Sequence, residues 1–164
     1  MRVLKVLVAL TLVLVLAGCG SKFRTYNGPE VTRVIVNKTE RVMYLMHHDE
    51  VLTKHRIDLG FAPAGHKRFE GDGKTPEGSY FIDRRNPNSS FHLSLGISYP
   101  NAEDIAAARA AGRSPGGDIF IHGKARRFQK RGTDWTAGCI SVSNREIERI
   151  YAMVRNGTRI DIYP

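Results

Sequence analysis

Cysteine is scarce in this sequence, with only Cys19 and Cys139 among 164 residues. Two cysteines cannot build the disulfide framework of a small secreted scaffold, and no paired Cys-x-x-Cys spacing is present to hold zinc. The six histidines do not follow a metal-binding spacing such as His-Glu-x-x-His. We therefore expect neither a metal nor another cofactor.

No apolar run in the sequence is long enough for a membrane-spanning helix, which needs about 20 such residues. The longest run, residues 6–16, follows Arg2 and Lys5 and leads into a Leu-Ala-Gly-Cys tetrapeptide that ends at Cys19. This order is typical of a signal peptide, and the tetrapeptide resembles a bacterial lipobox. By that resemblance residues 1–18 are removed and Cys19 is lipidated. The alternative is an ordinary signal peptide with an incidental cysteine.

A lipid on Cys19 would hold the chain on a membrane without a spanning helix. Gly20 follows instead of Asp, which by resemblance to Gram-negative lipoproteins favours the periplasmic face of the outer membrane. Cleavage leaves 146 residues and lowers the formal charge from +9 to about +7. That length suits one domain, and the basic balance favours acidic partners. For an exported lipoprotein, lipid headgroups and carboxylate-rich wall polymers fit better than nucleic acid.

Internal repeats, low-complexity tracts and a second domain are absent from the sequence. Residues 19–30 are expected to form the lipidated cysteine and a polar tether, and residues 31–164 one domain. β-Branched runs, period-two alternation and flanking turns predict strands over residues 31–36, 41–47, 51–59, 80–82, 91–99, 118–122, 139–142 and 158–163. Two short helices are expected, one over residues 102–111 capped by Asn101 and one after the capping box at Ser143. The fold class is therefore mainly β.

The second cysteine, Cys139, remains as the one free thiol of the mature chain, seventeen residues after His122. A thiol attacks as thiolate, and a neighbouring imidazole can lower its pKa and carry its proton. His122 ends one predicted strand and Cys139 begins another, so both can meet at one sheet edge. Gly123 and Gly138 beside them leave room for backbone amides to approach an oxyanion. A buried, inert cysteine is the alternative interpretation.

Two motifs now carry a family resemblance. His122-Gly123, followed after a loop by Thr136-Ala137-Gly138-Cys139, resembles the signature of the L,D-transpeptidase catalytic domain, the YkuD-like family. The segment Gly71-Asp72-Gly73-Lys74-Thr75-Pro76-Glu77-Gly78-Ser79-Tyr80 resembles a second motif of that family. The resemblance covers about residues 31–163. It implies a β-sandwich or partly closed barrel of the L,D-transpeptidase type.

The resemblance also implies a reaction. Cys139 would attack the carbonyl between L- and D-centres of a peptidoglycan stem peptide, and an amine would then take the acyl group. His122 would be the general base and acid, the amides of Gly138 and Cys139 would bind the oxyanion, and Gly123 would border the site. The chain departs from the family at Ala137, where histidine is usual. The identity of the group that accepts the acyl chain therefore stays open.

Other residues near the two motifs are candidates to contact substrate: Trp135, Thr136, His92, Arg126 and Arg127. Trp135 could line a cleft or simply pack, and His92 could be an ordinary surface histidine. The cations between His122 and Cys139, which include Arg126 and Arg127, could form a lid over acidic stem peptides or a solvated loop. The chain is thus expected to be an anchored L,D-transpeptidase. The alternatives are an L,D-carboxypeptidase or endopeptidase and a non-catalytic wall-binding lipoprotein.

Overall fold

Eight strands and two helices make up the computed structural model, which describes residues 21–125 and 132–164. The elements in chain order are β1 (Arg33–Asn37), β2 (Val42–His47), β3 (Glu50–Arg56), β4 (Gly78–Asn86), β5 (Ser94–Ile97), α2 (Ala102–Ala110), β6 (Phe120–His122), β7 (Ile140–Ser141), α3 (Asn144–Met153) and β8 (Arg159–Tyr163). The mainly β class with two short helices is confirmed.

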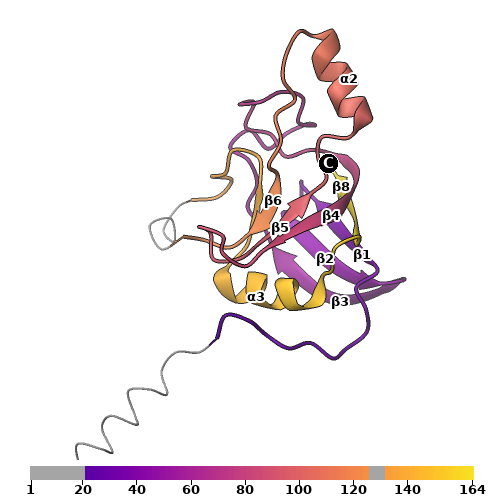
Figure 1. Cartoon of the computed structure of the whole chain (residues 1–164), viewed down its shortest axis with the longest axis vertical. Coiled ribbons are helices and arrows are strands. Elements are labelled where there is room, and N and C mark those ends of the chain that lie inside the picture. Colours follow the sequence, from indigo (N-terminus) through magenta and orange to yellow (C-terminus); the bar gives the residue numbers. More distant parts are fainter. Residues whose placement is uncertain (1–20, 126–131) are drawn as a thin grey trace, which may run out of the picture.

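The strands form one curled sheet in the order β3-β2-β1-β8-β4-β5-β6-β7. Pairing is parallel between β1 and β8 and between β6 and β7, and antiparallel elsewhere. The first residues of β4 pair with β8 and its later residues with β5, so this long strand joins the two halves of the sheet (Figure 1). The result is a half-barrel whose core lies on its concave side.

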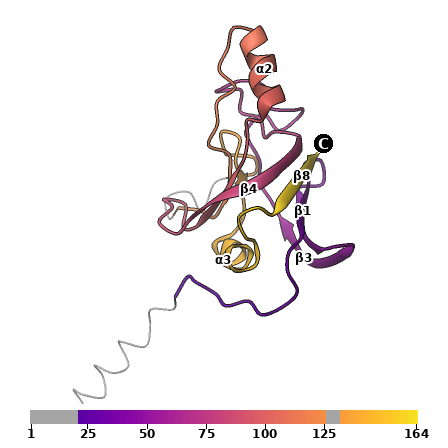
Figure 2. The same ribbon diagram turned by 45° about the vertical axis from the view of Figure 1, so that its right-hand side comes forward.

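Helix α3 packs its apolar stripe into this core. Ser143 caps the helix through the predicted capping box with Glu146. Ile147, Ile150 and Tyr151, spaced at i, i+3 and i+4, are buried along one face of the helix. Fully burying one such aliphatic side chain stabilises a fold by about 1.5–3 kcal/mol. The helix runs below the strands in Figure 1 and is seen end-on in Figure 2.

Helix α2 stands away from the sheet at the other end of the molecule in both views (Figures 1 and 2). Its Asn101 cap accepts a hydrogen bond from the backbone N–H of Asp104, whose carboxylate in turn accepts one from the N–H of Asn101. The Asp104 carboxylate also accepts a hydrogen bond from the Tyr80 hydroxyl at 2.9 Å. These contacts fix the start of the helix, which the sequence predicted.

Most strands end one to three residues from the predicted boundaries, and the length differs most in two of them. The strand predicted over 80–82 is longer, because β4 continues through Asn86 into residues predicted as loop. The strand predicted over 91–99 is shorter, because β5 is confined to Ser94–Ile97. Alternation nevertheless identified the core side of this segment, since Leu93, Leu95 and Ile97 are all fully buried.

Residues 21–30, predicted as a tether, lie against the domain without regular structure. The Lys22 ammonium donates to the carbonyl oxygens of Pro87 and His92, and Arg24 pairs with Glu148 of α3. In the part of the chain that the structure describes, no helix has the length and apolarity needed to cross a bilayer. The leader and Cys19 lie outside the described residues.

Candidate active site

His122 is the last residue of β6, and only 4% of it is exposed. Its Nδ1 lies 2.6 Å from the carbonyl oxygen of Gly123. Because a carbonyl only accepts, Nδ1 carries the proton and Nε2 of the neutral ring is the basic nitrogen. Burial lowers the pKa of His122, opposed by the hydrogen bond to Gly123. The residue is therefore a neutral imidazole, able to take a proton, at neutral pH.

Cys139 lies directly before β7 and is a free thiol. Its Sγ accepts the N–H of Phe120 at 3.4 Å and donates to the carbonyl oxygen of Asp118 at 3.5 Å. Burial raises the pKa of Cys139 and outweighs the hydrogen bond from the Phe120 N–H, which lowers it; the charge of Asp118 also raises this pKa, and that of Lys67 lowers it. The expectation that the imidazole lowers this pKa is therefore wrong for the resting geometry. Both shifts favour a neutral thiol beside a neutral imidazole.

The two side chains line one pocket of about 470 Å³. Its other lining residues come from the stretch between the end of β4 and the start of β5, from the β6 region and from the loop before β7: Asn86, Ser89, Ser90, Phe91, Ser94, Asp118, Phe120, Trp135, Thr136 and Ala137. No hydrogen bond joins Cys139 to His122 within residues 21–125 and 132–164. Catalytic hydrogen bonds are often long before substrate binds, so the shared pocket is the relevant observation.

Aromatic rings hold the imidazole in place. The ring centroid of Phe91 lies 4.5 Å from that of His122, and the indole of Trp135 meets the imidazole at 5.8 Å with an interplanar angle of 70°. Phe91 and Trp135 also contact each other at 6.0 Å. Trp135 therefore both lines the pocket and packs on the imidazole of His122, which combines the two roles left open by the sequence.

The loop before Cys139 is ordered by the hydroxyl of Thr136. This hydroxyl donates to the carbonyl oxygen of Cys139 at 2.6 Å and accepts the N–H of Gly138 at 3.2 Å. In this structure the Gly138 amide is therefore bound to Thr136, and its role as an oxyanion donor stays a prediction. The Cys139 N–H is the other predicted donor.

Only glycine fits at positions 123 and 138, because other atoms lie where a Cβ would have to be. Gly138 has φ +138°, and a Cβ there would lie 2.7 Å from the carbonyl oxygen of Lys74. A Cβ on Gly123 would lie 2.6 Å from Asn144 Oδ1 at the start of α3 and 2.9 Å from the Phe91 carbonyl oxygen. Real Cβ atoms essentially never approach other atoms within 3.0 Å. Gly123 contacts His122 through its carbonyl oxygen but does not line the pocket, so its place at the border of the site stays a prediction.

The Gly-rich segment over residues 71–80 supports the cysteine loop from behind. Asp72 accepts three backbone N–H groups, from Arg68, Phe69 and Lys74, together with the buried ammonium of Lys67. Burial raises the pKa of Asp72, but these donors outweigh it and lower the pKa to about 2. The turn so formed presents the Lys74 carbonyl to Gly138.

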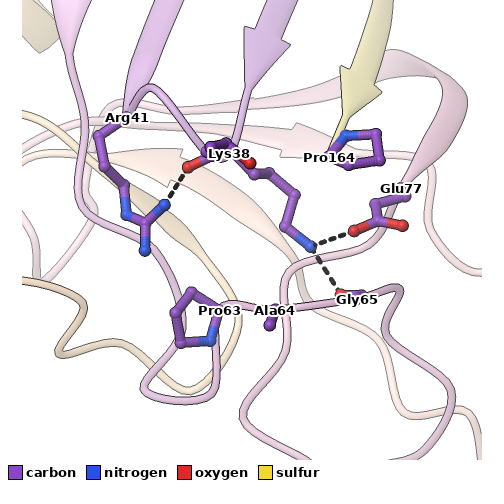
Figure 3. Close-up of a pocket in the computed structure, with 8 residues that line it drawn as sticks. Lys38, Arg41, Pro63, Ala64, Gly65, Glu77 and Pro164 are labelled. Atoms are coloured by element: carbon purple, nitrogen blue, oxygen red, sulfur yellow. Dashed lines mark hydrogen bonds and ion pairs between the residues drawn. The ribbon is translucent and has the colours of Figure 1, made fainter.

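A second pocket, of about 510 Å³, is lined by none of the residues of the first (Figure 3). The buried ammonium of Lys38 donates there to Gly65 O at 2.6 Å, Thr75 O at 3.0 Å and Glu77 Oε1 at 2.8 Å. Burial lowers the pKa of Lys38 and outweighs the hydrogen bond to Glu77, which raises it. Figure 3 also shows Arg41 donating to the Lys38 carbonyl oxygen. These bonds tie the β1–β2 turn to the segment behind the cysteine.

The structure does not bring every candidate into the pocket. His92 Nε2 lies 3.0 Å from Glu148 Oε1, and His92 is not among the lining residues. Lys124, the first cation of the loop after His122, bonds Asp58 at 3.1 Å. Arg126 and Arg127 lie outside the described residues. Cys19, the predicted lipidation site, does so as well.

Several site residues were not identified from the sequence. Phe91 was placed on the core side by alternation, but nothing in the pattern indicated its ring contact with His122. Phe120 and Asp118 hold the thiol through backbone groups, which carry no residue-type signal. In the described ranges, no group of three or more His, Cys, Asp or Glu side chains could hold a metal ion.

Comparison with known proteins identifies the family. The family model of the YkuD L,D-transpeptidase catalytic domain matches residues 31–162. The chain belongs to this family, and the fold predicted as a β-sandwich or partly closed barrel of the L,D-transpeptidase type is confirmed as a half-barrel that its structural neighbours share. Among curated proteins, the Escherichia coli (strain K12) protein named "Putative L,D-transpeptidase YafK" is 28% identical over 124 residues, which cover 70% of this chain and 45% of YafK.

Solved structures give the same fold. The helical cell shape determining protein Pgp2 of Campylobacter jejuni has a TM-score of 0.64 and 26% identity, over 88% of this chain and 51% of Pgp2. L,D-transpeptidase 1 of Mycobacterium tuberculosis has a TM-score of 0.53 and 14% identity, over 82% of this chain and 62% of that structure. The chain thus spans about half the length of YafK and Pgp2.

Proposed function

We propose that this protein is a peptidoglycan-modifying cysteine acyltransferase, an L,D-transpeptidase that forms an acyl-enzyme on Cys139. One observation carries the proposal: the free thiol and the buried neutral imidazole of His122 line the same pocket. Family membership supports it. Retention of both groups in one pocket argues against a non-catalytic wall-binding protein.

The first half-reaction uses the neutral pair. Nε2 of His122 takes the Sγ proton as the sulfur attacks the carbonyl between the L- and D-centres of a stem peptide. The carbonyl oxygen becomes an oxyanion, for which the Cys139 N–H is the nearest predicted donor. The intermediate collapses when His122 returns the proton to the leaving amine of the D-residue and the C–N bond breaks. A thioester on Cys139 remains.

The second half-reaction decides between transfer and hydrolysis. An acceptor amine attacks the thioester, gives its proton to His122 and releases the thiol, which is transpeptidation. Water in the same role gives carboxypeptidase or endopeptidase activity. Ala137 lines the pocket as a small exposed residue where the family usually has histidine, and the space it leaves keeps hydrolysis as the second candidate.

The proposed setting is the cell envelope, with the chain held by a lipid on Cys19 and acting on stem peptides of the wall. The positive formal charge of the chain, +9 including the leader, supports an acidic polymer as the partner. For a Gram-negative cell the proposed location is the periplasmic face of the outer membrane.

Intact-protein mass spectrometry tests the proposal. A soluble tetrapeptide stem should add the mass of the acylated tripeptide to the parent protein and nothing to a Cys139→Ala variant. Subsequent addition of an amine acceptor should yield a cross-linked product if the enzyme is a transferase, and free tripeptide if it is a hydrolase. Absence of any adduct and any product with the parent protein would overturn the proposal.

A further inference from the structure

We propose that residues 22–24, here termed the strap, hold the substrate-facing wall of the active site in position, with Lys22 as a positioning residue. The wall is the loop of residues 87–93 between β4 and β5, which contributes Ser89, Ser90 and Phe91 to the pocket. The catalytic part of this inference rests on the proposed function.

The strap contacts both ends of the wall. The Lys22 ammonium donates to the Pro87 carbonyl oxygen at 2.6 Å and to the His92 carbonyl oxygen at 3.1 Å. These two carbonyls are five residues apart in the chain, so one side chain bridges the loop. Hydrogen bonds with a charged partner contribute more than neutral ones. The bridge therefore restricts how far the wall can open.

A second set of contacts secures the strap to α3. Arg24 donates through Nε and Nη2 to Glu148 Oε2, at 2.9 and 2.6 Å. The other carboxylate oxygen of Glu148 lies 3.0 Å from His92 Nε2. Burial of Glu148 raises its pKa, but the bonds with His92 and Arg24 outweigh this and keep the pKa low. Glu148 thus joins the strap and the wall through one ionised carboxylate.

The wall in turn reaches the catalytic base. His92 has φ +78°, an unusual backbone conformation for a residue with a side chain, and its contacts with Lys22 and Glu148 fix this turn. The residue before it, Phe91, places its ring 4.5 Å from the imidazole of His122. Movement of the wall would therefore change the shape of the pocket. The imidazole has its own bond to Gly123 and should keep its orientation.

Substitution of Lys22 with methionine tests the inference in the full chain. Met keeps most of the aliphatic stem and removes both donors. We expect the loss of both hydrogen bonds to raise the KM for acylation by a soluble tetrapeptide at least about fivefold, with kcat changed less than about twofold. Lys22→Arg, which retains donors, should restore most of the KM. The matched control is Lys54→Met, an exposed lysine of β3 that contacts the Tyr44 ring.

Trp135 provides a readout that does not depend on catalysis, because it is the only tryptophan and lies 6.0 Å from Phe91. Acrylamide should quench its fluorescence more strongly in Lys22→Met than in the parent or Lys54→Met. Equal quenching in all three proteins, or an unchanged KM, would overturn the inference. Increased quenching in a protein whose parent forms no acyl-enzyme would support the wall and refute the proposed function instead.

Discussion

Arg41 and Asp134 form a two-pronged ion pair that anchors the cysteine loop. Arg41 Nε lies 2.9 and 3.1 Å from the two carboxylate oxygens of Asp134, and Nη2 lies 2.7 Å from Oδ2. Asp134 Oδ1 also accepts the Leu59 N–H at 3.0 Å. The bonds with Arg41 and Leu59 outweigh burial and lower the pKa of Asp134. One carboxylate therefore fixes the point at which the chain turns toward Trp135 and Cys139.

Substitution Asp134→Asn should loosen this anchor without disturbing the backbone, because asparagine tolerates the φ of +52° found there. Loss of the charged pairing should lower the free energy of unfolding by about 1–3 kcal/mol and slow acylation of Cys139. Urea unfolding and acylation rates measure the two effects. Glu103→Gln, an exposed carboxylate on α2, is the control. An Asp134→Asn protein with parental stability and rate would show that the pair is incidental.

Substitution Gly138→Ala should misplace the nucleophile. The new methyl would meet the Lys74 carbonyl oxygen at 2.7 Å in a backbone conformation that favours glycine. Displacement of a reacting group by about 1 Å can cost roughly 100-fold in rate, so we expect a loss of that order in acylation. Gly132→Ala in the same loop meets nothing within 4 Å and serves as the control. Similar rates for the two variants would contradict the steric argument.

Local sequence signals predicted the parts of the fold that local interactions decide. The caps at Asn101 and Ser143 form as expected, since each satisfies backbone groups within four residues. The stripe through Ile147 and Ile150 faces the core because its spacing matches the helical repeat. Cys139 and His122 were found through two short motifs, each of contiguous residues, and their meeting in one pocket was expected because each lies at the end of a predicted strand.

Local sequence signals could not predict contacts between residues that are far apart in the chain. The parallel pairing of β1 with β8 joins residues more than 120 positions apart, and neither strand's alternation specifies its neighbour. The Arg41–Asp134 pair and the Lys74 carbonyl behind Gly138 likewise depend on how three loops meet. The occupied Gly138 amide could not be foreseen either, because the hydroxyl of Thr136 reaches it only in the folded loop.

The pH dependence should reflect a neutral catalytic pair. Burial lowers the pKa of His122 below the ordinary value of about 6.5, so the base stays deprotonated and acylation persists into mildly acidic solution. Burial raises the pKa of Cys139, so alkylation by iodoacetamide, which needs thiolate, should rise only above the ordinary thiol range. Rates of acylation and of alkylation, both measured from pH 5 to 10, test these two expectations. Rapid, pH-independent alkylation near pH 7 would indicate a thiolate–imidazolium pair instead.

Acid should weaken the support behind the cysteine through Asp72. The folded pKa of about 2 lies below the ordinary 3.8, so its stabilisation is complete above pH 4 and is lost as the pH falls through 2. Substitution Asp72→Asn should therefore cost about 2 kcal/mol at pH 6 and little at pH 2. Urea unfolding at the two pH values measures this difference. Asp49→Asn, in an exposed turn, is the control, and a penalty independent of pH would refute the assignment.

Lipidation of Cys19 predicts a separation between location and catalysis. Cys19→Ser should move the protein from the detergent phase to the aqueous phase, because no other predicted segment is apolar enough to hold it on a membrane. Its acylation rate with a soluble stem peptide should be unchanged, since Lys22 and Arg24 remain to hold the wall. Cys139→Ser gives the reciprocal control: it should stay with the membrane and form no thioester. A Cys19→Ser protein that remains in the detergent phase would refute the lipid anchor. A Cys19→Ser protein that is released but also loses activity would show that the lipid anchor is needed to hold the strap in position.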